Sequence, residues 1–145
     1  MHSQILAPVV ALVAWTLVMM LWLYATRFPA MRRKGISMKG RVGTRGGALD
    51  GVVEDEVQWK AHNYNHLMEQ PTLFYAIAIS LALLGAGDVW INVWLAWAYV
   101  GFRILHSLIQ ATVNLVVWRF AFFALASFCL IGLTVHAAAR VLHGL

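Results

Sequence analysis

Charged residues and cysteine are scarce in this sequence, and each scarcity excludes a class of protein. Only 12% of the 145 residues are charged, whereas 61% are hydrophobic. Soluble domains carry about a quarter charged residues and are about half apolar, so this composition is typical of a membrane protein. The single cysteine, Cys129, excludes a disulfide framework and a cysteine-based metal site. Because it lies in an apolar stretch, we expect it to pack in the core rather than to react.

Long apolar runs are the abundant feature. Ile5–Tyr24 is free of charge, and about 20 helical residues cross a bilayer core. A cleavable signal peptide has a basic start and a shorter apolar core, so we interpret this run as a retained helix. Three more runs follow. We therefore predict one all-α integral membrane domain over residues 1–145, a bundle of four transmembrane helices with spans at about 5–24, 66–84, 89–108 and 115–137.

Basic residues are concentrated in one segment after the first apolar run. Residues 27–51 contain seven of the eleven Lys and Arg residues together with six glycines. Such a segment buries little apolar surface, so we expect an exposed, flexible loop, and it has no Walker pattern for binding phosphate. The positive-inside rule places this loop in the cytosol and both termini outside. We interpret the charges as a topology signal that faces anionic headgroups, and expect no nucleic-acid partner.

A helix is predicted to follow the loop. Asp50 is expected to be its N-cap, and the acidic residues 54–56 suit its first turn. A continuous helix to Leu84 would be about 50 Å long, so its first turns should project from a bilayer core of about 30 Å. Pro71 has no N–H to donate to the carbonyl of Leu67, so the helix should bend there. The bend could widen a binding site, or it could be a structural feature that neighbouring helices tolerate.

Polar side chains recur at helical spacing within these segments. One stripe contains Gln58, His62, Asn65 and Glu69, and a second contains Tyr99, Arg103, His106 and Gln110. In the predicted topology Glu69, Arg103, His106 and Arg119 lie at one depth near the cytosolic leaflet. Since charges facing lipid are costly, they should meet inside, with Glu69 paired to one arginine. The remaining positive charge favours an anionic ligand, and Arg119 is the strongest functional candidate.

These residues also have structural interpretations. Glu69 and Arg103 could be an ion pair that sets helix register, and His106 could be an interior histidine bonded to a carbonyl. Asn114 could simply cap the fourth helix. A proton or solute path through the ionisable residues is a third possibility, but the outer half of the bundle is apolar.

A metal site is not predicted. His62 and His66 have the i, i+4 spacing of a metal-binding pair on a helix. The sequence offers no third clear ligand beside them.

Three stretches together resemble the MAPEG family, the membrane-associated proteins in eicosanoid and glutathione metabolism: NHLMEQPTLFYAIA, LAWAYVGFRILHSLIQATVN and VVWRFAFF. Their order and spacing carry the resemblance, which is to a bacterial branch. It implies a four-helix bundle assembled as a homotrimer in the bacterial inner membrane. Glutathione is then the expected co-substrate, bound between neighbouring subunits toward the cytosolic side.

The resemblance also assigns roles to residues. In the family's enzymes a second-helix Asn and Glu contact glutathione, and Asn65 and Glu69 match them with one additional residue between. The family's Arg-x-x-His on the third helix matches Arg103 and His106. The second-helix Arg before the Asn is absent, and Lys60 is the nearest cation.

The resemblance also implies a catalytic residue. In the prostaglandin-synthase branch, an Arg that serves the thiol chemistry lies thirteen residues beyond that His, and Arg119 has this spacing. Gln110 and Phe123 stand where eicosanoid enzymes have tyrosines.

These observations predict a glutathione-dependent transferase or peroxidase for lipophilic electrophiles, with Arg119 stabilising the thiolate. Lys60 and Arg103 would hold the carboxylates of glutathione and Glu69 its ammonium group. His62, Asn65 and Gln110 complete the predicted substrate-binding set. The alternative is a non-catalytic membrane scaffold or lipid-binding protein whose buried ion pairs are structural.

Overall fold

The computed structural model describes residues 3–144, and this part of the chain is helical without any strand. The elements are α1 (Leu6–Arg33), the 3₁₀ helix η1 (Gly46–Leu49), α2 (Asp55–Leu67), α3 (Gln70–Leu83), α4 (Trp90–Thr112) and α5 (Val116–His143). The all-α prediction is confirmed. The outermost residues of the predicted domain, 1, 2 and 145, lie outside the described residues.

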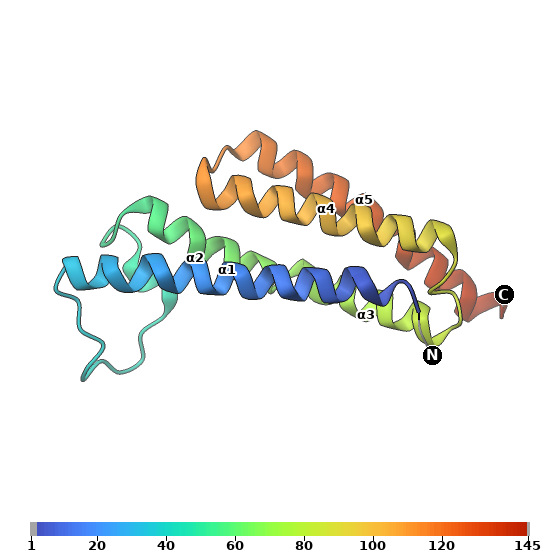
Figure 1. The fold of residues 1–145 in the computed structure, drawn as a ribbon, viewed down its shortest axis with the longest axis horizontal. Helices are drawn as coiled ribbons and strands as arrows, with labels where there is room; N and C mark the ends of the chain where they lie inside the picture. Colours follow the sequence, from blue (N-terminus) through green and yellow to red (C-terminus); the bar gives the residue numbers. More distant parts are fainter. Residues whose placement is uncertain (1–2, 145) are drawn as a thin grey trace.

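The helices form an elongated bundle (Figure 1). α2 and α3 follow one another end to end beside α1, while α4 and α5 form an antiparallel hairpin along the other side. The start of α1 and the end of α5 lie at one end of the bundle, and the loop between α1 and α2 lies at the other. Residues of α2, α4 and α5 that are far apart in sequence are thereby brought to the same level.

Two helices, α1 and α5, are long and apolar enough to cross a membrane. Each has 28 residues, which corresponds to about 42 Å at 1.5 Å per residue. Their outer faces expose large apolar side chains, including Val10, Leu21, Phe128 and Ile131. α3 has only 14 residues, and α4 carries several polar groups. Four spans therefore remain a prediction.

The core lies where α1, α3 and α4 meet. Phe74 and Tyr99 are fully buried, and their rings stack with centroids 4.4 Å apart. Leu12 and Met19 of α1 belong to the same buried cluster. Burial of one such side chain contributes about 1.5–3 kcal/mol, so this layer holds α3 and α4 in a defined register.

The predicted start of the second helix is wrong. α2 begins at Asp55, with Glu54 before it, and the backbone of Asp50 is extended. Asp50 instead accepts hydrogen bonds from Gln58 Nε2 at 2.5 Å and from His62 Nε2 at 3.1 Å. Its side chain therefore ties the loop to α2 through one buried residue, Gln58, and one exposed residue, His62.

The predicted continuous helix is also wrong, because it is interrupted between α2 and α3. Glu69 has φ −90° and ψ −97°, outside the helical region. Pro71 lies in the first turn of α3, where its missing N–H would have no helical acceptor. The expected bend is thus a full break that leaves carbonyl groups of α2 without helical donors.

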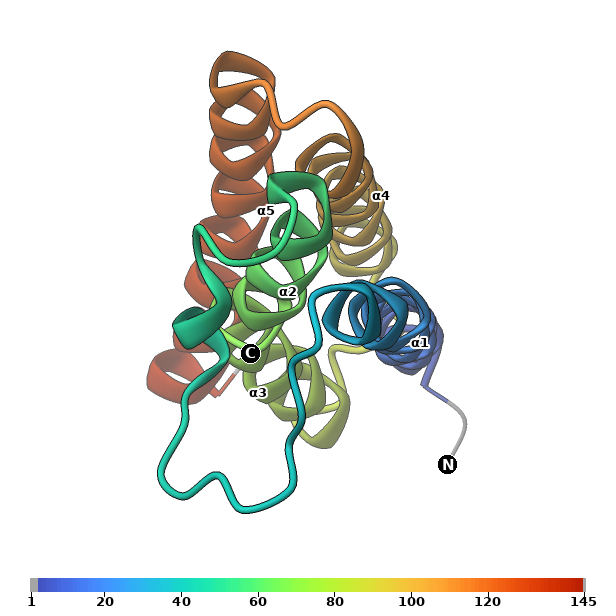
Figure 2. The same cartoon turned by 90° about the vertical axis from the view of Figure 1, so that its left-hand side faces the viewer.

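The basic loop is shorter than predicted because α1 continues to Arg33. Figure 2 shows the chain leaving α1, swinging out and returning through η1 to α2. Most of residues 34–54 are exposed. Leu49 and Val53 are buried against Met31 and Val57, so the second half of the loop is attached to the bundle.

Candidate functional site

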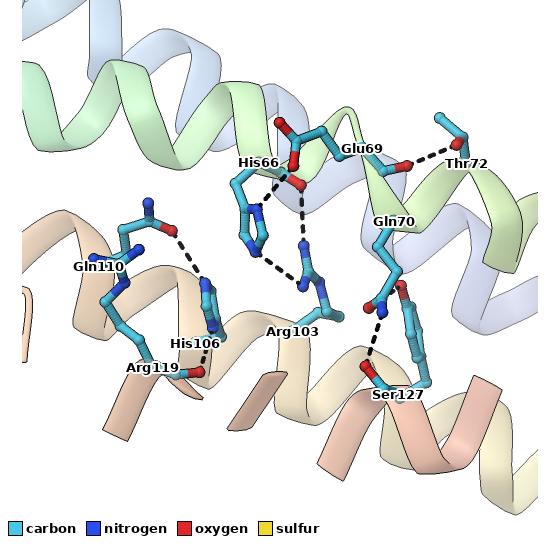
Figure 3. A network of polar contacts seen from close by, with 10 residues as sticks. His66, Glu69, Gln70, Thr72, Arg103, His106, Gln110, Arg119 and Ser127 are labelled. Carbon is cyan, nitrogen blue, oxygen red and sulfur yellow. Dashed lines mark hydrogen bonds and ion pairs between the residues drawn. The ribbon is translucent and has the colours of Figure 1, made fainter. Parts of the chain in front are cut away.

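Arg103 lies at the break between α2 and α3. Its side chain is fully buried, with Nη2 donating to the carbonyl oxygen of His66 at 3.1 Å and Nη1 lying 3.4 Å from His66 Nε2 (Figure 3). Its guanidinium carbon is 5.9 Å from the centre of the Phe123 ring. Within residues 3–144 no carboxylate forms a salt bridge with it. Arg103 therefore donates a hydrogen bond to a carbonyl at the C-terminal end of α2 and brings a positive charge into the bundle.

The expected ion pair between Glu69 and an arginine is absent from the described part of the chain. Glu69 Oε2 instead lies 3.2 Å from His66 Nδ1, and 69% of its side chain is exposed. The helix break turns Glu69 outward, so His66 stands between it and Arg103 (Figure 3). The carboxylate does not neutralise Arg103 by direct contact.

His106 links α4 to the first turn of α5. Its Nδ1 donates to the carbonyl oxygen of Arg119 at 2.8 Å, and its Nε2 lies 3.1 Å from Gln110 Oε1. The ring is buried. The interpretation of an interior histidine bonded to a carbonyl agrees with this geometry, which fixes the position of Arg119.

Arg119 retains an unsatisfied donor. Its Nη1 donates to Asn114 Oδ1 at 2.7 Å, while Nε is buried without a hydrogen-bond partner. Asn114 does not cap α5 through its side chain; it lies in the turn with φ 52°, and Leu115 is the N-cap. Arg119 thus lies in the first turn of α5, where the helix dipole adds positive potential.

A cavity of about 220 Å³ opens beside these groups. His66, His106 and Arg119 line it together with Val116, Phe120 and Phe123. The rings of His66 and His106 are 4.8 Å apart, and His66 is 5.7 Å from Phe123. Because no lining residue is acidic, the cavity combines a positive edge with aromatic walls. We call it the Arg119 cavity.

Comparison with known proteins identifies the family. The MAPEG family model matches residues 5–139. The chain belongs to the MAPEG family. Members of this family are membrane proteins and include glutathione transferases and peroxidases as well as other proteins. Searches of curated proteins and of solved structures gave no match.

Of the seven predicted substrate-binding residues of this MAPEG protein, only His106 lines the Arg119 cavity in the described structure, and three lie on other parts of α2. Lys60 Nζ donates to the carbonyl oxygen of Glu56 at 2.6 Å and lies over the ring of Trp22. His62 is exposed and contacts the loop, and Asn65 is exposed on α2. The structure brings Arg103, His106, Gln110 and Arg119 together and places Glu69 at their margin through His66.

A second polar cluster lies at the loop end of the bundle. Asp50, Asp55, Gln58 and His62 line a cavity of about 290 Å³ there, along with Trp59 and Asn114. The hydrogen bond from Gln58 is the main reason that the pKa of Asp50 is lowered, and His62 contributes further. No group of three or more His, Cys, Asp or Glu side chains within residues 3–144 is arranged to hold a metal ion.

The inner face of α2 carries polar residues outside the predicted stripes. Asn63 Nδ2 donates to Ser107 Oγ at 2.8 Å, and Oδ1 of the same amide is buried without a hydrogen-bond partner. Gln70 Nε2 donates to Ser127 Oγ at 2.8 Å. Asn63, His66 and Gln70 follow the i, i+3, i+7 spacing of a stripe. The sequence thus contains a second polar stripe on the predicted second helix, offset by one residue from the predicted one.

Proposed function

We propose that this MAPEG protein is a membrane enzyme, a glutathione-dependent transferase or peroxidase that acts on lipophilic electrophiles. The observation that carries the proposal is the Arg119 cavity, where a partly exposed cation with an unsatisfied Nε donor faces aromatic walls and no carboxylate. A cation and an apolar surface together suit a thiolate and the lipophilic molecule that it attacks.

The role proposed for Arg119 is to stabilise the glutathione thiolate. A free thiol has a pKa of about 8.5, and a cation a few ångströms away can lower that pKa by roughly 1 to 3 units. The N-terminal end of α5 contributes in the same direction. The thiolate sulfur then attacks the electrophilic carbon, and the leaving group departs with the bonding electron pair.

The size of the cavity supports a site completed by a second subunit. About 220 Å³ is less than the roughly 300–1,000 Å³ of typical ligand pockets, so one chain encloses only the thiol end of the tripeptide. Asn65 and Glu69, four residues apart around the end of α2, are both exposed. In a homotrimer they would face a neighbouring subunit, with Glu69 binding the ammonium group of glutathione.

Arg103 and His106 take a different part in the proposed site than the sequence suggests. Both are buried. Arg103 Nη2 and His106 Nδ1 donate to the carbonyl oxygens of His66 and Arg119, while Nε of Arg103 is buried without a partner. We therefore propose that they position His66 and Arg119 and do not themselves hold the carboxylates of glutathione. We propose that a partly exposed cation of the neighbouring subunit, such as Lys60, binds these carboxylates.

The proposed membrane arrangement keeps four spans, with the basic loop in the cytosol and both termini outside a bacterial inner membrane. Its support is the loop at one end of the bundle and both helical termini at the other (Figure 1). Lipophilic substrates would then reach the site laterally from the lipid.

The test compares Arg119→Gln with Arg119→Lys in purified, folded protein. Isothermal titration should show glutathione binding to the wild type, and ultraviolet absorbance should show thiolate formation in the bound state. Arg119→Gln should lose the thiolate signal and most conjugation of 1-chloro-2,4-dinitrobenzene, and Arg119→Lys should retain part of both. Arg140→Gln, at the opposite end of α5, removes the same charge and serves as the control. Absence of binding at millimolar glutathione in the folded wild type would overturn the proposal.

The rival function is a non-catalytic scaffold. The observation that favours it is that the described structure satisfies most of the buried polar groups within one chain, as the bonds of His106 and Gln70 illustrate. If this is correct, Arg119→Gln lowers stability without changing any glutathione signal.

A further inference from the structure

A second cavity lies between the end of α1 and the basic loop, and the proposed enzyme activity makes no use of it. Its volume is about 410 Å³. Arg27, Arg41 and Arg45 line it on the charged side, and Tyr24, Phe28 and Met31 are among its apolar lining. We call it the loop cavity.

The charge of this cavity is only weakly compensated. None of its three arginines forms a salt bridge with a carboxylate in the described residues, whereas nearby Arg33 pairs with Glu54 at 3.6 Å. Arg27 Nη2 donates to the carbonyl oxygen of Gly46 at 2.9 Å, and its charge contributes to the lowered pKa of Asp50. Arg41 and Arg45 have no such contact with an acidic group. A bound group is therefore expected to be anionic.

The apolar lining of the cavity is partly exposed. The rings of Tyr24 and Phe28 stack at 5.5 Å, yet the residues remain 44% and 48% exposed. Met38 from the loop lines the same cavity and is 63% exposed. A free phosphate or nucleotide phosphate would leave this surface in water, whereas a lipid would cover it.

The depth of the cavity matches a headgroup. α1 begins at Leu6, and a bilayer core of about 30 Å takes about 20 helical residues. Tyr24 to Met31 therefore lie where the hydrocarbon ends, and Arg27 is the first charged side chain of the helix. Aromatic residues and basic residues at this level are the usual contacts of lipid headgroups.

We propose that the loop cavity binds an anionic phospholipid from the leaflet on the side of the basic loop. The phosphate lies against Arg41 and Arg45, and the upper part of an acyl chain covers Tyr24, Phe28 and Met31. The bound lipid attaches the first half of the loop to α1. The second half is already attached to the bundle by the buried contacts of Leu49 and Val53. This site is independent of glutathione.

The test uses two double variants with the same change in charge. Arg41→Gln/Arg45→Gln removes charges that line the cavity, and Lys34→Gln/Lys39→Gln removes two from the same loop outside it. Full-length protein in non-ionic detergent is incubated with phosphatidylglycerol, or with phosphatidylcholine of the same acyl chains. Native mass spectrometry counts the lipids retained, and glycerol phosphate is added as a soluble competitor. Thermal melting confirms that both variants fold.

The wild type and the lysine variant should prefer phosphatidylglycerol, and the arginine variant should bind it at least tenfold more weakly, as expected when two charge-assisted contacts are lost. Equal loss in both variants would show diffuse surface attraction and overturn the proposal. So would equal retention of both lipids by the wild type, or displacement of the lipid by glycerol phosphate at equal concentration. These results leave the glutathione test of Arg119 unaffected.

Discussion

Arg103 Nη2 lies 3.1 Å from the carbonyl oxygen of His66, so a fully buried cation on α4 caps the C-terminal end of α2. At the break this carbonyl lacks its α-helical donor, and the only backbone N–H within residues 3–144 bonded to it is that of Glu69 at 3.3 Å. A guanidinium is suited to the position because it is planar, carries several donors and stays charged. The same contact holds the ring of His66 beside the Arg119 cavity.

Replacement of Arg103 should therefore destabilise the protein. Arg103→Gln is expected to lose about 1.5–3 kcal/mol, the contribution of a hydrogen bond from a charged group. For a chain of this length the loss lowers the melting temperature by roughly 3–12 °C. Thermal melting in detergent measures it, with Lys39→Gln in the exposed loop as the control. An unchanged melting temperature would show that the contact to His66 is not stabilising.

Replacement of Pro71 should affect stability far less than replacement of Arg103. It lies in the first turn of α3, where the N–H that an alanine adds has no helical acceptor. Pro71→Ala should change stability by at most about 1 kcal/mol, mainly through the entropy of the unfolded chain. Circular dichroism and thermal melting should be nearly unchanged. A clear gain in helix content would instead mean that proline alone interrupts the helix.

The stability contributed by the hydrogen bonds of Asp50, which attach the loop to α2, should depend on pH. Hydrogen bonding from Gln58 lowers the pKa of this carboxyl, and the effect of His62 adds to it. A lowered folded-state pKa contributes stability that is complete above the unfolded pKa of about 3.9 and is lost as pH falls through the folded value. The side-chain amide signals of Gln58 in an NMR titration should shift with a midpoint below 3.9. Asp50→Asn should abolish the titration, and a midpoint above the ordinary value would contradict the contact.

Gly87 and Gly101 provide a matched pair of substitutions. A Cβ at Gly87 would lie 3.0 Å from the backbone Cα of Ala82 and 2.9 Å from Cγ2 of Ile5, so the start of α1 would have to move. Gly101, inside α4, has open space around it. Gly87→Ala should lower the melting temperature by a few degrees, and Gly101→Ala should raise it because alanine favours a helix by about 1 kcal/mol. A tolerated Gly87→Ala would show that the turn before α4 is free to adjust.

Much of the fold and part of the site could be predicted from the sequence. The apolar runs, the basic loop between the first two of them and the level at which Arg103, His106 and Arg119 meet all follow from residue order, because hydrophobic length and charge position depend only on local sequence. The interior role of His106, bonded to a carbonyl, was one of the alternatives.

The tertiary structure alone decided which face of α2 points inward. Two polar stripes are possible on the predicted second helix, one through His62, Asn65 and Glu69 and one through Asn63, His66 and Gln70. They are offset by one residue, a rotation of about 100° about the helix axis, and both have helical spacing. Periodicity therefore could not choose between them. Packing against Ser107 and Arg103 selects the second stripe.

The helix break and the exposed position of Glu69 could likewise not be predicted from local sequence. Proline predicts a disturbance near position 71. The interruption at Glu69 is stabilised by Arg103, thirty-four residues later, which donates to the His66 carbonyl in addition to the 3.3 Å bond from the Glu69 N–H. What the sequence by itself determined is the set of buried charges and their depth. Which charges touch depends on helix rotation and on contacts between distant segments, and these exist only when the helices pack together.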